Sequence, residues 1–102
     1  KGFHEGNEGV YLIVGDYQII VRTTPLWTVD DAPATVNGMP FSEYLLRVSE
    51  QYMLQHFLLT GKDYVLNGSL SAKSSYEDVI LELDQIVLNT VKSYEMFAEI
   101  TA

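Results

Sequence analysis

The segment from residue 76 to residue 102 contains neither Gly nor Pro, and this is the feature that most limits the possible folds. Apolar residues and Thr recur in it at alternating steps of four and three, the spacing of one helix face. Ser75 lies three residues before Asp78, which resembles a capping box. The pattern predicts one helix over 76–101, about 39 Å long at about 1.5 Å per residue. The repeating positions are Tyr76, Ile80, Leu83, Val87, Thr90, Tyr94, Phe97 and Thr101.

This predicted helix is long for the chain that carries it. With 102 residues, the chain is expected to form one domain with a radius of gyration near 13 Å, or about 33 Å across. On a helical wheel the expected core stripe is Tyr76, Ile80, Leu83, Val87, Val91, Tyr94 and Ala98. Val79, Ile86 and Phe97 widen this stripe on one side, and Leu81 and Leu88 widen it on the other. The apolar sector then covers roughly 200° in the first half of the helix, whereas a surface helix needs about 100°. The opposite side is expected to be polar, with Glu82, Gln85, Asn89, Lys92 and Ser93.

The stretch 10–24 is rich in β-branched and aromatic residues, which is typical of strands. Gly15-Asp16 at its centre suits a two-residue turn, so a β-hairpin is expected with Val14 opposite Tyr17 and Val10 opposite Val21. Alternation then places six residues on the core face. They are Val10, Leu12, Val14, Tyr17, Ile19 and Val21.

The middle of the chain predicts a loop, a helix and a short hairpin. All three Pro residues fall in 24–40, a segment in which we expect Trp27 to plug the edge of the core and Pro40 to disfavour a hairpin at Asn37-Gly38. Ser42 resembles an N-cap for a helix over 43–59, with Gly61 as its C-cap. Asn67-Gly68 is the commonest type I′ turn dipeptide.

These elements predict an α+β fold, in which antiparallel β-hairpins pack against two helices on one face, in the order ββ-α-(ββ)-α. Residues 1–9 are expected to be a flexible lead-in and residues 10–102 a single domain. Because the chain starts with Lys1 and not Met, its native N-terminus is left open.

The net charge of −8 argues against direct nucleic-acid or anionic-lipid binding, since both rely on clustered Lys and Arg. Cys is absent, which removes thiolate metal sites and thiol nucleophiles. No apolar run reaches the roughly 18–20 residues that span a bilayer, so no membrane partner is expected and the cytoplasm is the default location.

Candidates for chemistry are weak. A catalytic triad needs a His base, and only His4 and His56 are available. Neither lies in a turn of the kind that presents a nucleophile. His4, Glu5 and Glu8 lie among Gly residues that impose no ligand geometry. The adjacent acids at 30–31 and 77–78 suit a turn and a helix N-terminus. We therefore predict no enzymatic activity, no catalytic residues, no cofactor and no metal.

The most concrete hypothesis is a protein–protein interaction or assembly subunit, in which the long helix self-associates or docks onto a protein partner. Homo-oligomers and larger assemblies both fit. The residues expected to make the contact are Leu81, Leu88, Val91, Glu77, Asp84 and Glu95.

Two alternatives remain open. An acidic inhibitor or immunity-type protein would block a basic partner, such as a nucleic-acid-binding protein, and salt would weaken that binding strongly. A small-molecule binder or enzyme would need a pocket that holds both Trp27 and His56.

Overall fold

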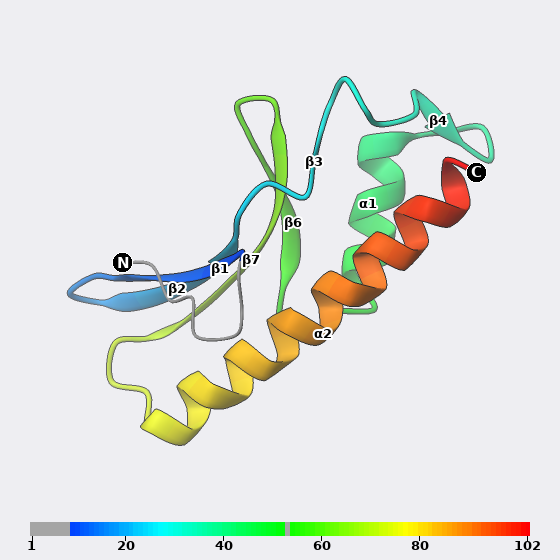
Figure 1. Ribbon diagram of the computed structural model, residues 1–102. Helices are drawn as coiled ribbons and strands as arrows, with labels where there is room; N and C mark the ends of the chain where they lie inside the picture. Colours follow the sequence, from blue (N-terminus) through cyan, green and yellow to red (C-terminus); the bar gives the residue numbers. More distant parts are fainter. Residues whose placement is uncertain (1–8, 53) are drawn as a thin grey trace.

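A computed structural model describes residues 9–52 and 54–102 of the chain (Figure 1). It has the expected α+β order, ββ-α-ββ-α, with short strands between the first hairpin and the first helix. The elements are β1 (Val10–Val14), β2 (Gln18–Thr23), β3 (Trp27–Thr28), β4 (Thr35–Val36), β5 (Met39–Pro40), α1 (Phe41–Ser49), β6 (His56–Thr60), β7 (Asp63–Ser71) and α2 (Tyr76–Ile100). The predicted lead-in, apart from Gly9, lies outside the described residues.

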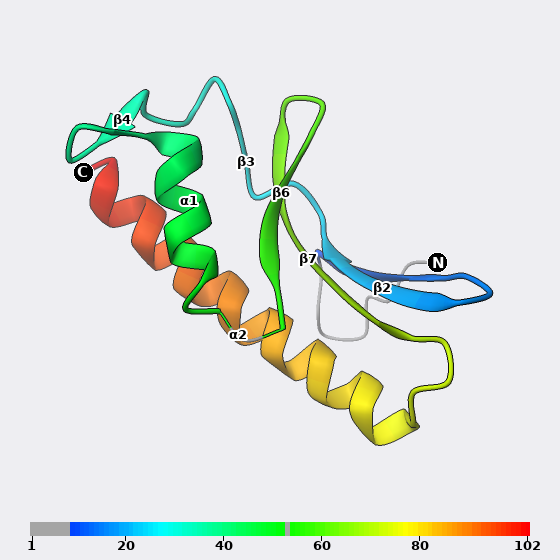
Figure 2. The same cartoon turned by 180° about the vertical axis from the view of Figure 1, so that it is seen from behind.

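The long strand β7 organises the sheet. Its first half pairs with β6 along one edge and with β3 along the other, and its second half pairs with β2, which in turn pairs with β1. Helix α2 runs diagonally along the molecule, with α1 beside its C-terminal half (Figures 1 and 2). The molecule measures 42 × 24 × 23 Å. The 25 residues of α2 span roughly 37 Å of the longest axis.

The first hairpin forms with a register two residues away from the predicted one. Val14 pairs with Ile19 and Val10 with Thr23, and the turn is closed by a 2.9 Å hydrogen bond from Gly15 N–H to the Gln18 carbonyl. Because side chains alternate with a period of two, this shift leaves the predicted faces unchanged. Val10 and Val21 are accordingly buried. Val14 and Tyr17, which were also predicted on the core face, lie at the turn end of the hairpin and are exposed.

The predicted helix over 43–59 is wrong at both ends. Helix α1 starts at Phe41 after Pro40, which places Ser42 in the first turn and not at the N-cap, and it ends at Ser49. Residues 56–60 form strand β6, which turns through Gly61-Lys62 into β7. Gly61 has φ +62°, so it serves the hairpin turn and not a helix C-cap.

Asn67-Gly68, expected as a turn, lies inside β7 instead. A Cβ at Gly68 would overlap the Glu82 carboxylate and would lie 2.8 Å from the Leu54 carbonyl oxygen. Glycine is needed there because α2 and the segment before β6 approach this strand closely. Asn37-Gly38 does form a hairpin turn, between β4 and β5, with φ of 53° and 80°. Pro40 is accommodated at the edge of that two-stranded pair.

Trp27 belongs to the core as predicted, but it lies at the centre and not at the edge, and only 5% of it is exposed. Phe97 of α2 stacks on it at 4.3 Å between ring centroids, and Phe41 of α1 approaches it edge-on at 6.3 Å. Phe57 and Tyr64 of the second hairpin lie at 6.0 and 6.4 Å. Both helices therefore meet the sheet around one indole ring.

Candidate functional site

The face of α2 that packs against the sheet is partly polar. Leu83 and Ile86 are buried there as expected, but Glu82, Asn89 and Ser93 are also almost completely buried. These three residues were expected on the solvent side, so the predicted orientation of the helix is wrong in this respect. Spacings of seven and four residues place all three on one side of a helix.

Hydrogen bonds to the segment between α1 and β6 explain this burial. Gln55 Nε2 donates to Glu82 Oε2 at 2.7 Å, and Asn89 Nδ2 donates to Gln55 Oε1 at 2.6 Å. Ser93 Oγ donates to the Asn89 carbonyl at 2.7 Å and lies 2.9 Å from the Tyr52 hydroxyl. Buried polar groups are stable when they are paired in this way.

Neither of the two ion pairs among the described residues involves Glu82; they join Arg47 to Glu43 and Lys62 to Asp30. Burial raises the pKa of the Glu82 carboxyl, and the Gln55 hydrogen bond opposes this only in part. Burial likewise raises the pKa of the Tyr52 hydroxyl. The polar stripe of α2 therefore includes a carboxyl group for which the charged form is disfavoured.

Because the polar stripe faces inward, a large part of the apolar sector faces outward. The exposed fractions are 58% for Leu81, 49% for Leu88 and 50% for Val91. Tyr76, Ile80 and Tyr94 are also exposed, although they were predicted to form the core stripe with Val91. Of that stripe, Leu83 is buried and Val87 is partly buried. The helix is thus rotated away from its predicted core face.

The outward face of α2 is defined here by the six residues that the sequence nominated for contact. Their steps of four, three, four, three and four keep them within a sector of about 80° at 100° per residue. All six are exposed, over about 27 Å of helix. In chain order they are Glu77, Leu81, Asp84, Leu88, Val91 and Glu95. Apolar and acidic side chains therefore form one continuous row.

The candidates for chemistry are dispersed. His56 lies exposed on β6, not on a helix, and Trp27 is buried in the aromatic core. His4, Glu5 and Glu8 lie outside the described residues. Across residues 9–52 and 54–102, no group of three or more His, Asp or Glu could hold a metal ion. In the same part of the chain, no helix has the length and apolar character needed to cross a membrane.

A second surface feature was missed from the sequence. An apolar pocket of about 190 Å³ lies between α1 and β6. The prediction of a single helix over 43–59 merged the two walls of this pocket into one element. The reversal at Gly61 was the available signal, since a glycine between two apolar runs also suits a hairpin.

Comparison with known proteins identifies the family. Residues 4–101 match the family described as "Uncharacterized protein conserved in bacteria (DUF2170)", and the chain belongs to it. No curated protein matches the chain.

Proposed function

We propose that this protein is a non-catalytic assembly subunit that self-associates through the outward face of α2. The supporting observation is the exposure of Leu81, Leu88 and Val91 in one row. Apolar side chains spaced by three and four along a helix are the usual seam of helix–helix association. Covering them with the same row from a second copy would remove all three from water at once.

The row also has a pattern that suits two-fold pairing. Two copies of α2 can be paired antiparallel, with the two-fold axis at the level of Ile86 along the helix. Leu81 then meets Val91 of the second copy, and Asp84 meets Leu88 of the second copy. A two-fold axis requires this kind of reciprocal contact, because the same patch is used on both sides. Glu77 then faces Glu95 of the second copy, so this contact is expected to be weak at low salt.

Sedimentation equilibrium over a range of protein concentrations tests this proposal. We expect reversible dimers for the unchanged protein, and Leu88→Glu should reduce the association constant by at least about tenfold, because a charge would be buried in the seam. Val14→Glu is the matched control, since Val14 is also exposed but lies on the first hairpin, away from α2. Monomers at every concentration, or equal losses in both variants, would rule out self-association through this face.

A basic protein partner is the second candidate, and the charge of α2 favours it. The helix carries six acids and one Lys, which accounts for −5 of the net −8. Poly-L-lysine is a suitable first probe in calorimetric titrations at low and high salt. Tight binding that is lost at high salt and weakened by Glu77→Gln with Glu95→Gln would support a basic partner. Self-association, in contrast, should be strengthened by salt.

A further inference from the structure

Strand β6 is an edge strand of the sheet, and the direction of its backbone groups follows from β7. The Tyr64 carbonyl accepts from Leu26 N–H at 2.8 Å, and Leu66 N–H donates to Thr23 Oγ1 at 3.0 Å. Even-numbered residues of β7 therefore direct their backbone N–H and carbonyl groups toward β2 and β3. Odd-numbered residues direct theirs toward β6. In an antiparallel ladder, Leu58 and Thr60 then bond to β7, while Phe57 and Leu59 point their backbone groups outward.

One observation supports this assignment independently. Phe57 N–H donates to Ser49 Oγ of α1 at 3.1 Å, so it does point away from β7. Three outward groups remain, namely the Phe57 carbonyl and both the N–H and the carbonyl of Leu59. None has a hydrogen-bond partner within the described residues. A row of unpaired donors and acceptors at this spacing is what another strand can satisfy.

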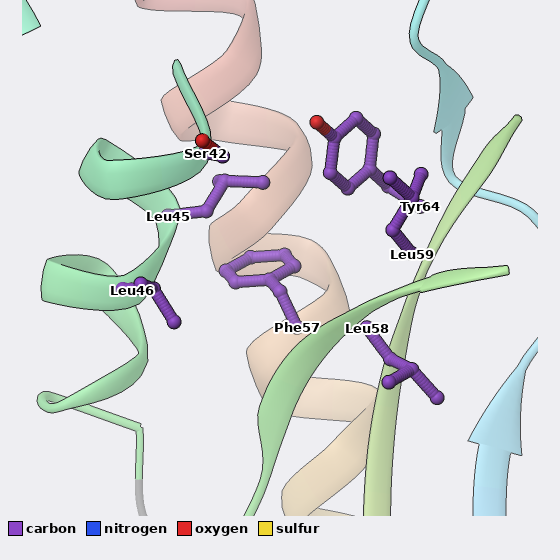
Figure 3. A pocket seen from close by; sticks show the side chains of 7 residues that line it. All are labelled: Ser42, Leu45, Leu46, Phe57, Leu58, Leu59 and Tyr64. Carbon is purple, nitrogen blue, oxygen red and sulfur yellow. The ribbon is translucent and has the colours of Figure 1, made fainter. Parts of the chain in front are cut away.

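The pocket between α1 and β6 lies at this same edge. Figure 3 shows the side chains of Leu45 and Leu46 of α1 directed toward Phe57 across it. Consecutive strand residues point to opposite faces, so a pocket lined by 57, 58 and 59 together must follow the edge of the strand. Leu46 is 67% exposed and Leu59 is 50% exposed. The unpaired backbone groups thus border an open apolar groove.

We propose that this groove binds an extended peptide segment, which adds to the sheet as a strand beside β6 and inserts one apolar side chain into the pocket. A helix cannot use the edge, because its own backbone groups are already paired. An apolar cavity of about 150 Å³ holds a benzene molecule, so a pocket of about 190 Å³ has room for one Leu or Phe side chain. Strand addition combined with a side-chain pocket is a recurring mode of peptide recognition.

The site lies on α1 and β6 and does not depend on the outward face of α2. Its charge surroundings are modest, because the nearest cation on α1, Arg47, is already paired with Glu43 at 3.1 Å. The expected ligand is therefore an uncharged segment with apolar residues at alternate positions. Backbone pairing supplies affinity, and the pocket supplies selectivity for the inserted side chain.

Amide NMR with a blocked hexapeptide of alternating Thr and Leu tests the proposal. We expect the Leu59 amide signal to shift and its hydrogen exchange to slow on binding, while the amides of Leu58 and Thr60 are protected before peptide is added. Replacing the Leu residues of the probe by Phe should preserve binding. N-methylation of the peptide residues that pair with β6 should weaken binding by at least about tenfold, the equivalent of one net backbone hydrogen bond.

Two protein variants separate the groove from the rest of the surface. Leu46→Glu should also weaken peptide binding by at least about tenfold, and Tyr17→Ser, at an exposed residue far from the groove, should not. The proposal fails if neither peptide affects Leu59 or if the N-methylated peptide binds equally well. It also fails if the Leu59 signal moves with protein concentration alone, because a second copy would then occupy the groove.

Discussion

At the scale of single residues, Glu82 is unusual because it is an acidic residue on the core side of α2 and is only 1% exposed. Burial raises its pKa above the ordinary value of 4.5. At a pH between the pKa of Glu82 in the unfolded state and its higher pKa in the folded state, the folded protein binds more protons than the unfolded chain. The free energy of unfolding therefore falls as the pH rises through this window. Above the folded-state pKa, Glu82 is ionised in the folded protein, and the full cost of burying its charge is present.

We therefore expect Glu82→Gln to stabilise the protein at neutral pH by about 1 kcal/mol or more, because an amide can keep the Gln55 contact without a buried charge. Below pH 4.5 the difference from the unchanged protein should vanish. Urea unfolding at a series of pH values measures both effects. Glu99→Gln, an exposed acid on the same helix, is the control and should follow the unchanged protein. Destabilisation by Glu82→Gln at neutral pH would show that the native state requires the charge.

Gly68 is the residue that permits this arrangement. Gly68→Ala is expected to destabilise the fold by about 1–3 kcal/mol, since the added methyl group overlaps Glu82 and lies 2.8 Å from the Leu54 carbonyl. Gly15→Ala is the matched control, because its Cβ would meet only the Gln18 carbonyl at 3.4 Å. Thermal unfolding compares the two variants. Equal melting temperatures would mean that α2 and the sheet can separate slightly at no cost.

At the scale of elements, the start of α2 is set by its cap. Ser75 Oγ accepts from Asp78 N–H at 3.1 Å, as the sequence predicted. Ser75→Ala should cost about 1 kcal/mol, and Ser75→Asp should retain most of the stability, because a carboxylate can accept the same hydrogen bond. Chemical unfolding followed by circular dichroism measures both. Similar losses for Ala and Asp would indicate that the hydrogen bond to Asp78 N–H is not what Ser75 contributes to stability.

Elements with strong local signals were predicted from the sequence, namely the first hairpin and α2. The prediction for residues 43–59 was wrong, because their apolar spacing suits one helix, whereas their observed structure depends on contacts with other segments. Gln55 is buried in hydrogen bonds to α2, and Phe57 N–H bonds back to Ser49. A continuous helix would prevent both. The bonds of Gln55 join residues far apart in the sequence, and periodicity does not report such contacts.

The same limit applied to the candidate site. The six contact residues share one face because their spacing alone requires it, and this could be predicted. The direction of the face depended on the buried stripe of Glu82, Asn89 and Ser93, whose polarity suggested solvent. The groove beside β6 needed the correct assignment of residues 56–60 as a strand, so it could not be predicted.

At the scale of the whole molecule, the elongated shape favours self-association along α2, whereas the negative charge of that helix opposes it. The molecule is elongated along α2, and a seam on that helix is its longest available contact. The seam is also acidic, and in the antiparallel pairing centred near Ile86 each Glu77 faces a Glu95 of the second copy. Like charges in such positions oppose association, so salt and neutral substitutions should favour it.

The double variant Glu77→Gln with Glu95→Gln should therefore dimerise more tightly than the unchanged protein at low salt. Two exposed like-charge contacts at about 0.2–1 kcal/mol each correspond to roughly a two- to thirtyfold change in the dissociation constant. Sedimentation equilibrium at low and high salt measures it, and the difference should shrink at high salt because screening removes the repulsion. Asp16→Asn with Glu50→Gln removes two exposed acids away from α2 and controls for net charge. If this control pair tightens the dimer equally, net charge and not the seam governs association; a looser dimer in the test pair would exclude the antiparallel register.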